Sequence, residues 1–194
     1  FDKNVIEFVT VAAEFCAFLE RAESMKRSTF VDTTLKILPL LYLKASMLPK
    51  CEMIGDESPE TYVTEEIYEV LRINLASILA EKDDYLEVFL PDMAYSDEPI
   101  KKNISEDLAD IYQDIKDFIF VFQLGLNETM NDSLAICQEN FGLLWGQKLV
   151  NTMRALHDVK YSPKARGEDE EEEEYEPENN EDCHCEDDDC HCHD

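Results

Sequence analysis

The stretch SEDLADIYQDIKDFIFVF, residues 105–122, has the clearest helical pattern in the chain. Its apolar residues recur every three or four positions and share one face of a helix: Leu108, Ile111, Tyr112, Ile115, Phe118, Ile119 and Phe122. Ser105 is a candidate N-cap, and Gly125 stands where such a helix would end. The stretch therefore predicts a helix with one buried side, and other elements must cover that side.

Four further segments have the same periodicity and predict helices over about 5–19, 29–48, 65–79 and 127–157. Pro39 predicts a kink or a break in the second of them, and Thr64 and Asn127 are candidate caps of the last two. Val70 belongs to the predicted buried face of the third, and the last directs six residues inward: Leu134, Cys137, Phe141, Leu144, Trp145 and Leu156. Residues 83–99 predict a brief helix followed by an irregular loop. Residues 1–161 are therefore predicted to form an all-α, up-and-down bundle of about five helices.

The chain is strongly acidic, with a formal net charge of −28 over 194 residues. Residues 167–194 hold 16 acidic side chains and no Lys or Arg, and the part before them is acidic as well. This balance argues against nucleic acid or an anionic membrane surface as a partner. Residues 162–182 have almost nothing apolar to bury, so they predict a disordered acidic linker.

Residues 183–194 concentrate metal-ligating side chains in an internal repeat, because Asp182-Cys183-His184-Cys185 recurs as Asp189-Cys190-His191-Cys192. In an extended segment alternate side chains share a face, so each unit offers two thiols on one side. Folding the units together would give zinc a tetrahedral shell, while copper(I) and nickel remain alternatives. The candidate metal ligands are Cys183, Cys185, Cys190 and Cys192, together with His184, His191 and His193. The alternative is an acidic tail whose cysteines only oxidise or scavenge stray metal.

The other three cysteines have no such clustering. Cys16 and Cys137 fall on apolar helix faces and Cys51 opens a loop, which predicts reduced, structural thiols in a reducing cytoplasmic compartment. No apolar run is long enough to predict a membrane span, and no segment has the pattern of a signal peptide.

The helical part shows no motif that predicts an activity. It lacks the Glu-x-x-His pairs of carboxylate-bridged metal sites, a glycine-rich phosphate loop and a nucleophile signature. Glu14 and Glu139 are interpreted as solvated, and His157 as a cation near the carbonyl end of a helix.

Two classes of function follow from these patterns. The first is a non-enzymatic helical module whose tail binds a metal for storage, delivery, sensing or docking to a protein partner. The second is an enzyme whose active site is assembled from bundle residues that no sequence motif reveals. A concave pocket with converging carboxylates would favour the enzyme, and a featureless bundle would favour the binding module.

Three stretches carry a resemblance to a known family: MKRSTFVDTTLKILPLLYLKASMLPKCEMIGDESPETYVT (25–64), PIKKNISEDLADIYQDIKDFIFVFQLGLNETMNDSL (99–134) and ENFGLLWGQKLVNTMRALHDV (139–159). They resemble domain-of-unknown-function family 5063, found in Bacteroides-type bacteria, over most of residues 1–160. The resemblance implies an all-helical cytoplasmic protein of unassigned activity and transfers no catalytic residue. The tail is similar to the zinc motif at the carboxyl end of the SecA translocation motor, and Cys183, Cys185, Cys190 and His191 are the matching positions.

Overall fold

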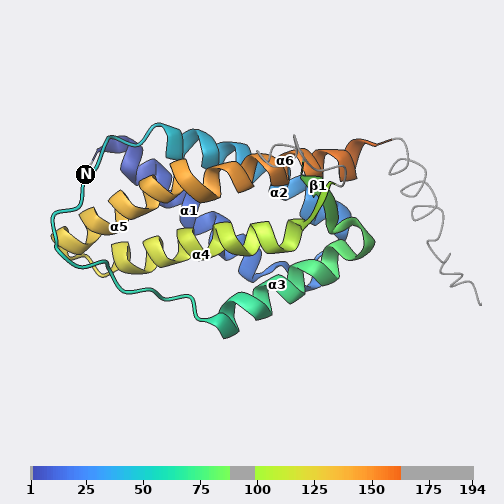
Figure 1. The fold of residues 1–194 in the computed structure, drawn as a ribbon, viewed down its shortest axis with the longest axis horizontal. Helices are drawn as coiled ribbons and strands as arrows, with labels where there is room; N and C mark the ends of the chain where they lie inside the picture. The colour runs from blue at the N-terminus through green and yellow to red at the C-terminus, as the bar shows by residue number, and fades with distance from the viewer. Residues whose placement is uncertain (1, 88–98, 163–194) are drawn as a thin grey trace, which may run out of the picture.

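A computed structural model of the protein describes residues 2–87 and 99–162, which form mainly helices (Figure 1). The α-helices in chain order are α1 (Lys3–Glu20), α2 (Arg27–Ser46), α3 (Glu65–Leu79), α4 (Ile104–Gln123), α5 (Asn127–Asn140) and α6 (Gly146–Tyr161). Short 3-10 turns follow α1 and α3, namely η1 (Ala22–Ser24) and η2 (Ala80–Lys82). A π-helical turn, η4 (Phe141–Trp145), joins α5 to α6 without a loop, so these three elements form one long helix. The predicted five-helix, all-α bundle is confirmed for the described residues.

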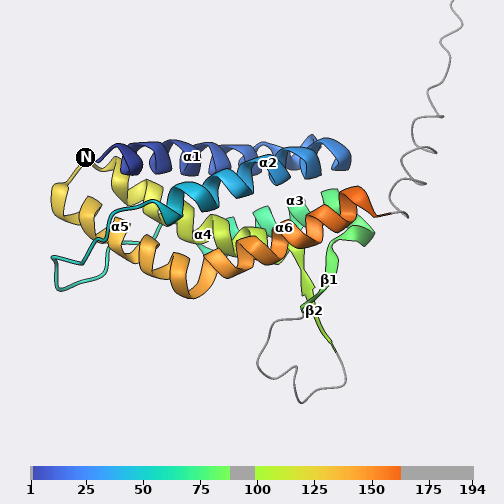
Figure 2. The same ribbon diagram turned by 90° about the horizontal axis from the view of Figure 1, so that it is seen from above.

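Helix α4 occupies the centre of the bundle, where it packs against α1, α3, α5 and α6 (Figure 2). The stripe predicted from the sequence is the side of α4 that faces these helices. Four of its core residues have no exposed surface: Ile104, Leu108, Ile111 and Ile115. Since burial of each such side chain contributes about 1.5–3 kcal/mol, the covering of α4 is a main source of the stability of the bundle.

Two predicted helix ends are confirmed. Thr64 caps α3, because its side-chain oxygen accepts a hydrogen bond from the backbone N–H of Ile67 at 3.3 Å. Gly125 follows α4 with a φ of +75°, a left-handed conformation that glycine adopts without steric cost.

Two predicted caps are wrong. Helix α4 already begins at Ile104, and Ser105 is a donor to the Asp83 carboxylate through its backbone N–H and its hydroxyl, both at 2.7 Å. The Asp83 carboxylate, 22 residues earlier in the chain, therefore accepts the hydrogen bond of a backbone N–H group at the start of α4. The N-cap of α5 is Leu126 and makes no side-chain cap, so Asn127 is already the first helical residue.

The brief helix predicted after residue 83 is also wrong. Strand β1 (Asp84–Glu87) pairs antiparallel with β2 (Ile100–Asn103), with Asp84 opposite Asn103 and Glu87 opposite Ile100. Burial alternates along β1, as a strand requires, because Leu86 is exposed while Glu87 is buried. The partner strand lies beyond residues 88–98, so the local sequence did not reveal the pairing.

Helix α2 is one continuous helix, so of the kink or break predicted at Pro39 the break does not occur. Pro39 is exposed, whereas Leu38 and Leu41 beside it are completely buried. Burial of these neighbours holds the helix together although proline removes one backbone hydrogen bond.

Two residues predicted to face inward are exposed: Leu144 by 52% and Val70 by 56%. Leu144 lies in the π turn, where an extra residue per turn rotates the side chains away from the positions of a regular helix. Val70 lies on α3. The apolar stripe of this helix is wider than the part of its surface that the neighbouring helices cover, so Val70 stays exposed.

Within the described ranges, no helix has the length and hydropathy needed to cross a membrane.

Candidate functional site

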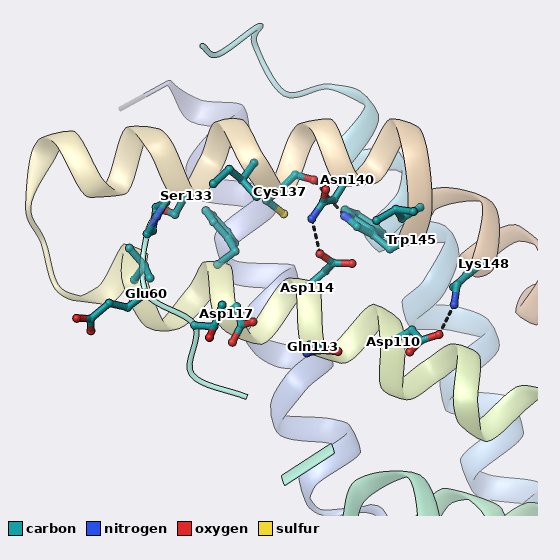
Figure 3. A pocket seen from close by; sticks show the side chains of 16 residues that line it. Glu60, Asp110, Gln113, Asp114, Asp117, Ser133, Cys137, Asn140, Trp145 and Lys148 are labelled. Atoms are coloured by element: carbon teal, nitrogen blue, oxygen red, sulfur yellow. Dashed lines mark hydrogen bonds and ion pairs between the residues drawn. The ribbon is translucent and has the colours of Figure 1, made fainter. Parts of the chain in front are cut away.

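A pocket of about 420 Å³ lies between α4 and the long helix formed by α5, η4 and α6 (Figure 3). The loop that precedes α3 closes one side of it, through residues 59–61. Four carboxylates and one ammonium group line the pocket: Glu60, Asp110, Asp114, Asp117 and Lys148. Its apolar lining includes Phe118, Val121, Ile136 and Trp145.

The acidic wall comes from the polar face of α4. Asp110, Asp114 and Asp117 are separated by four and three residues, so they lie on one side of the helix. The acidic face was not predicted from the sequence, because apolar periodicity marks only the opposite face of this helix. The spacing was a visible signal, but the partners of these carboxylates come from distant segments.

Both oxygens of the Asp110 carboxylate accept hydrogen bonds. The Tyr68 hydroxyl donates to one carboxylate oxygen at 2.8 Å, and the Lys148 ammonium group donates to the other. Burial lowers the pKa of Lys148, but the hydrogen bond to Asp110 and the negative charges of Asp110, Asp107 and Glu106 together outweigh this effect, so the pKa is raised. Asp110 therefore holds α3 and α6 against α4.

Asp117 anchors the loop that closes the pocket. One of its oxygens accepts hydrogen bonds from the backbone N–H groups of Tyr62 and Val63, both at 2.7 Å. Burial raises the pKa of Asp117, while these two hydrogen bonds oppose the rise. The loop is thereby fixed one helical turn away from Asp114.

Asp114 accepts fewer hydrogen bonds than either of the other two aspartates of this acidic wall. Its Oδ1 accepts a hydrogen bond from the Asn140 side-chain amide at 2.6 Å, and the described residues provide no partner for Oδ2 (Figure 3). Burial raises the pKa of Asp114, the hydrogen bond from Asn140 opposes the rise, and the charges of Asp117 and Asp110 add to it. A ligand that brings a positive charge to this oxygen would oppose both effects that raise the pKa.

The π turn positions the aromatic side of the pocket. Trp145 is completely buried, and its indole Nε1 donates to the Cys137 carbonyl at 3.1 Å. Gly146 follows directly, and its N–H donates to the Phe141 carbonyl, the hydrogen bond that closes the turn. π turns inside α-helices are frequent at functional sites because they redirect side chains locally.

Two potential nucleophiles line the pocket, Ser133 and Cys137, and neither is activated. The Ser133 hydroxyl donates to the Met130 carbonyl at 3.0 Å. Complete burial raises the pKa of the Cys137 thiol well above its usual range, so this group stays protonated. Cys16, Cys51 and Cys137 are all free thiols, as predicted.

The other residues singled out in the sequence lie elsewhere. Glu14 and Glu139 are exposed, as predicted. His157 is exposed on α6, where its ring lies 4.6 Å from that of Tyr161, and it does not line the pocket.

Among residues 2–87 and 99–162, no three His, Cys, Asp or Glu side chains are grouped to hold a metal ion. The predicted tail ligands lie outside the described residues: Cys183, Cys185, Cys190, Cys192, His184, His191 and His193.

The fold and the pocket together define a helical bundle protein with an acidic pocket on its central helix. The family model of the domain of unknown function DUF5063 matches residues 1–162, and the chain belongs to this family, as its sequence predicted. The crystal structure of protein BF1032 from Bacteroides fragilis is similar, with a TM-score of 0.78 and 93% sequence identity over 86% of this chain and 98% of that chain. A search of curated proteins found no significant match.

Asp107, one turn before Asp110 on α4, gives a test of the electrostatics beside the pocket. It is buried, which raises its pKa to about 6, although it accepts a hydrogen bond from the Tyr85 hydroxyl. Because the folded pKa is raised, the stabilising effect of protonation is complete below the unfolded pKa and is lost as pH rises through about 6. Asp107→Asn keeps an acceptor for Tyr85 and removes the charge. We expect this variant to gain roughly 1–2 kcal/mol of unfolding free energy over the parent at pH ~8, and almost none at pH ~4.

Urea denaturation at pH ~4, ~6 and ~8 measures this difference, given that unperturbed carboxylates titrate near pH ~4. Glu139→Gln is the matched control, since it removes one exposed charge from the neighbouring helix. A gain for Asp107→Asn that did not change with pH would contradict the assignment.

Proposed function

We propose that the bundle is a ligand-binding module and that its pocket takes a small organic cation. One observation carries the proposal: Oδ2 of the half-buried Asp114 lines the pocket and has no partner among the described residues. Around it stand three more carboxylates and only one ammonium group, that of Lys148. The pocket is thus negatively charged, and Oδ2 of Asp114 is available to a donor.

The remaining lining favours an organic cation over a metal ion. Asp110 and Asp117 are bound to Lys148 and to the backbone of the loop, so they supply few additional oxygen ligands. Phe118 and Trp145 give the pocket an apolar wall. A ligand that joins a protonated amine to an apolar body would contact both kinds of surface.

Acid–base catalysis is the second candidate, because the converging carboxylates and the raised pKa of Asp114 are typical of a general acid or base. Ser133 and Cys137 are unavailable as activated nucleophiles, so an enzyme would depend on the carboxylates alone. Binding requires only the groups that are already in place, so it is the better supported function.

A fluorescence titration tests the binding proposal. Trp145 is the only tryptophan of the chain and lines the pocket, so its emission reports occupancy. We expect 2-phenylethylamine to bind and the neutral 2-phenylethanol, of the same shape, to bind at least tenfold more weakly. Asp114→Asn is expected to weaken amine binding about tenfold, which corresponds to about 1.4 kcal/mol of lost charge interaction.

Glu139→Gln is the control for the loss of one negative charge, since Glu139 is exposed on α5 and lies outside the pocket. It should bind the amine with the affinity of the parent protein. Equal affinity for the amine and the alcohol would refute the proposed cation site.

We also propose that residues 183–194 bind zinc and that the bundle and this tail act together in metal storage, delivery, sensing or docking to a protein partner. The support is the repeated Cys-His-Cys unit, with four cysteines and three histidines in eleven residues. Thiolates and imidazoles are the ligands that zinc prefers in closed tetrahedral sites.

A further inference from the structure

A second hollow, of about 650 Å³, runs along α2 and the carboxyl-terminal half of α6. We call it the α2–α6 groove. Much of its floor is apolar, formed by Leu35, Pro39, Tyr42, Val150 and Met153. Tyr42 and Val150 are exposed by 40% and 45%, so the described residues leave this apolar surface open to solvent.

Positive charge borders the same groove. Lys36, Arg154 and Lys160 line it together with a single carboxylate, that of Asp32. Asp32 accepts hydrogen bonds from Lys160 and from Lys36, and these two contacts lower its pKa to about 2. The groove is therefore a locally positive surface on a chain whose net charge is −28.

We propose that residues 168–177 of the same chain dock in the α2–α6 groove. This segment begins with seven consecutive acidic residues, EDEEEEE, and continues with Tyr175 and Pro177. The acidic run complements the three cations of the groove, and the tyrosine and proline supply apolar groups for its floor. The occupant thus matches both surfaces that the groove presents.

The segment that links α6 to residue 168 is long enough for the acidic run to reach the groove. Helix α6 ends at Tyr161, which itself lines the groove. Residues 162–167 can span up to about 20 Å when extended. The groove follows α6 back from Tyr161 to Val150, about 16 Å at the rise of an α-helix. Residue 168 can therefore reach any part of the groove from the end of α6.

The backbone amide resonance of Tyr175 in the full-length protein tests the docking from the side of the tail. At low salt we expect its chemical shift to differ from that in an isolated peptide of residues 167–182. Lys36→Glu reverses one groove charge and should move the shift at least halfway to the peptide value. The Lys36 side chain is 73% exposed, so the fold tolerates this change. Raising the salt to about 0.5 M should have the same effect, because it screens exposed charges beyond a few ångströms.

Lys50→Glu is the matched control, since Lys50 is exposed outside the groove, and it should leave the Tyr175 shift unchanged. A parent shift equal to that of the isolated peptide would overturn the proposal. A shift that returned to the peptide value on dilution would also overturn it, because the occupant would then be the segment of a second copy.

Discussion

Changing Cys183, Cys185, Cys190 and Cys192 together to serine is expected to reduce bound zinc from about one ion per chain to background, because four thiolates form a complete tetrahedral shell. The effect is large because the three remaining histidines and the carboxylates of the tail cannot replace four thiolates in the shell of a borderline-soft metal. Metal analysis after reduction and removal of loosely bound ions measures the difference. Equal zinc content in the two proteins would contradict the proposal.

Because the carboxylates of the tail could also bind metal, a second measurement must separate them from the thiolates. Thiols and imidazolium groups must lose a proton to become the thiolates and neutral imidazoles that bind metal, and unperturbed Cys and His titrate near pH ~8.5 and ~6.5. Bound zinc should therefore persist through neutral pH and leave in mildly acidic buffer. Binding by carboxylates alone would persist to about pH ~4 and would give cobalt no thiolate charge-transfer band. Release that followed carboxylate protonation would support the alternative of an acidic tail that scavenges metal.

Gly146→Ala is expected to lower the free energy of unfolding by about 2–3 kcal/mol or more, because overpacking against backbone cannot relax locally. A Cβ atom at this position would lie 2.3 Å from the Phe141 carbonyl oxygen and 2.9 Å from Cδ2 of the Phe141 ring. The carbonyl accepts the hydrogen bond that closes the π turn, so it cannot move away without opening that turn. Thermal unfolding should show a midpoint lower by roughly 5–10 °C for a protein of this size.

Gly142→Ala is the matched control, four residues earlier in the same long helix. Nothing lies within 4 Å of its added Cβ atom, so alanine should be neutral or stabilising by about 0.5–1 kcal/mol through its better helix propensity. Near-ultraviolet circular dichroism of Trp145 adds a local readout, and we expect it to change only in Gly146→Ala. If both variants unfolded at the same temperature, the π turn would not have the role assigned to it.

The helices could be predicted from the sequence because their signals are local. The stripe on α4 and the Thr64 cap each depend on residues within a few positions of one another. The hairpin could not be predicted in this way, since β2 follows β1 only after the segment 88–98. Nor could the true partner of Ser105 be found, because Asp83 comes from another turn of the chain.

The pocket was missed for a related reason. The acidic face of α4 resembles any solvated helix face until the loop of Tyr62 and Val63 closes over Asp117, 55 and 54 residues away in sequence. The π turn adds one residue to a turn of helix. Leu144, which was predicted to face the core, therefore points to solvent. Periodicity assumes a regular helix and therefore fails at such a turn.

The most direct test of the cation site is an NMR titration of the full-length protein with 2-phenylethylamine. The Asn140 side-chain amide donates to Asp114 and the Trp145 indole N–H lies in the same pocket, so both resonances report on the site. We expect these two signals to shift together and to saturate with one dissociation constant, and we expect Asp114→Asn to raise that constant about tenfold for both signals. Shifts confined to the acidic residues after Gly167, with the Asn140 and Trp145 signals unmoved, would contradict the proposed pocket.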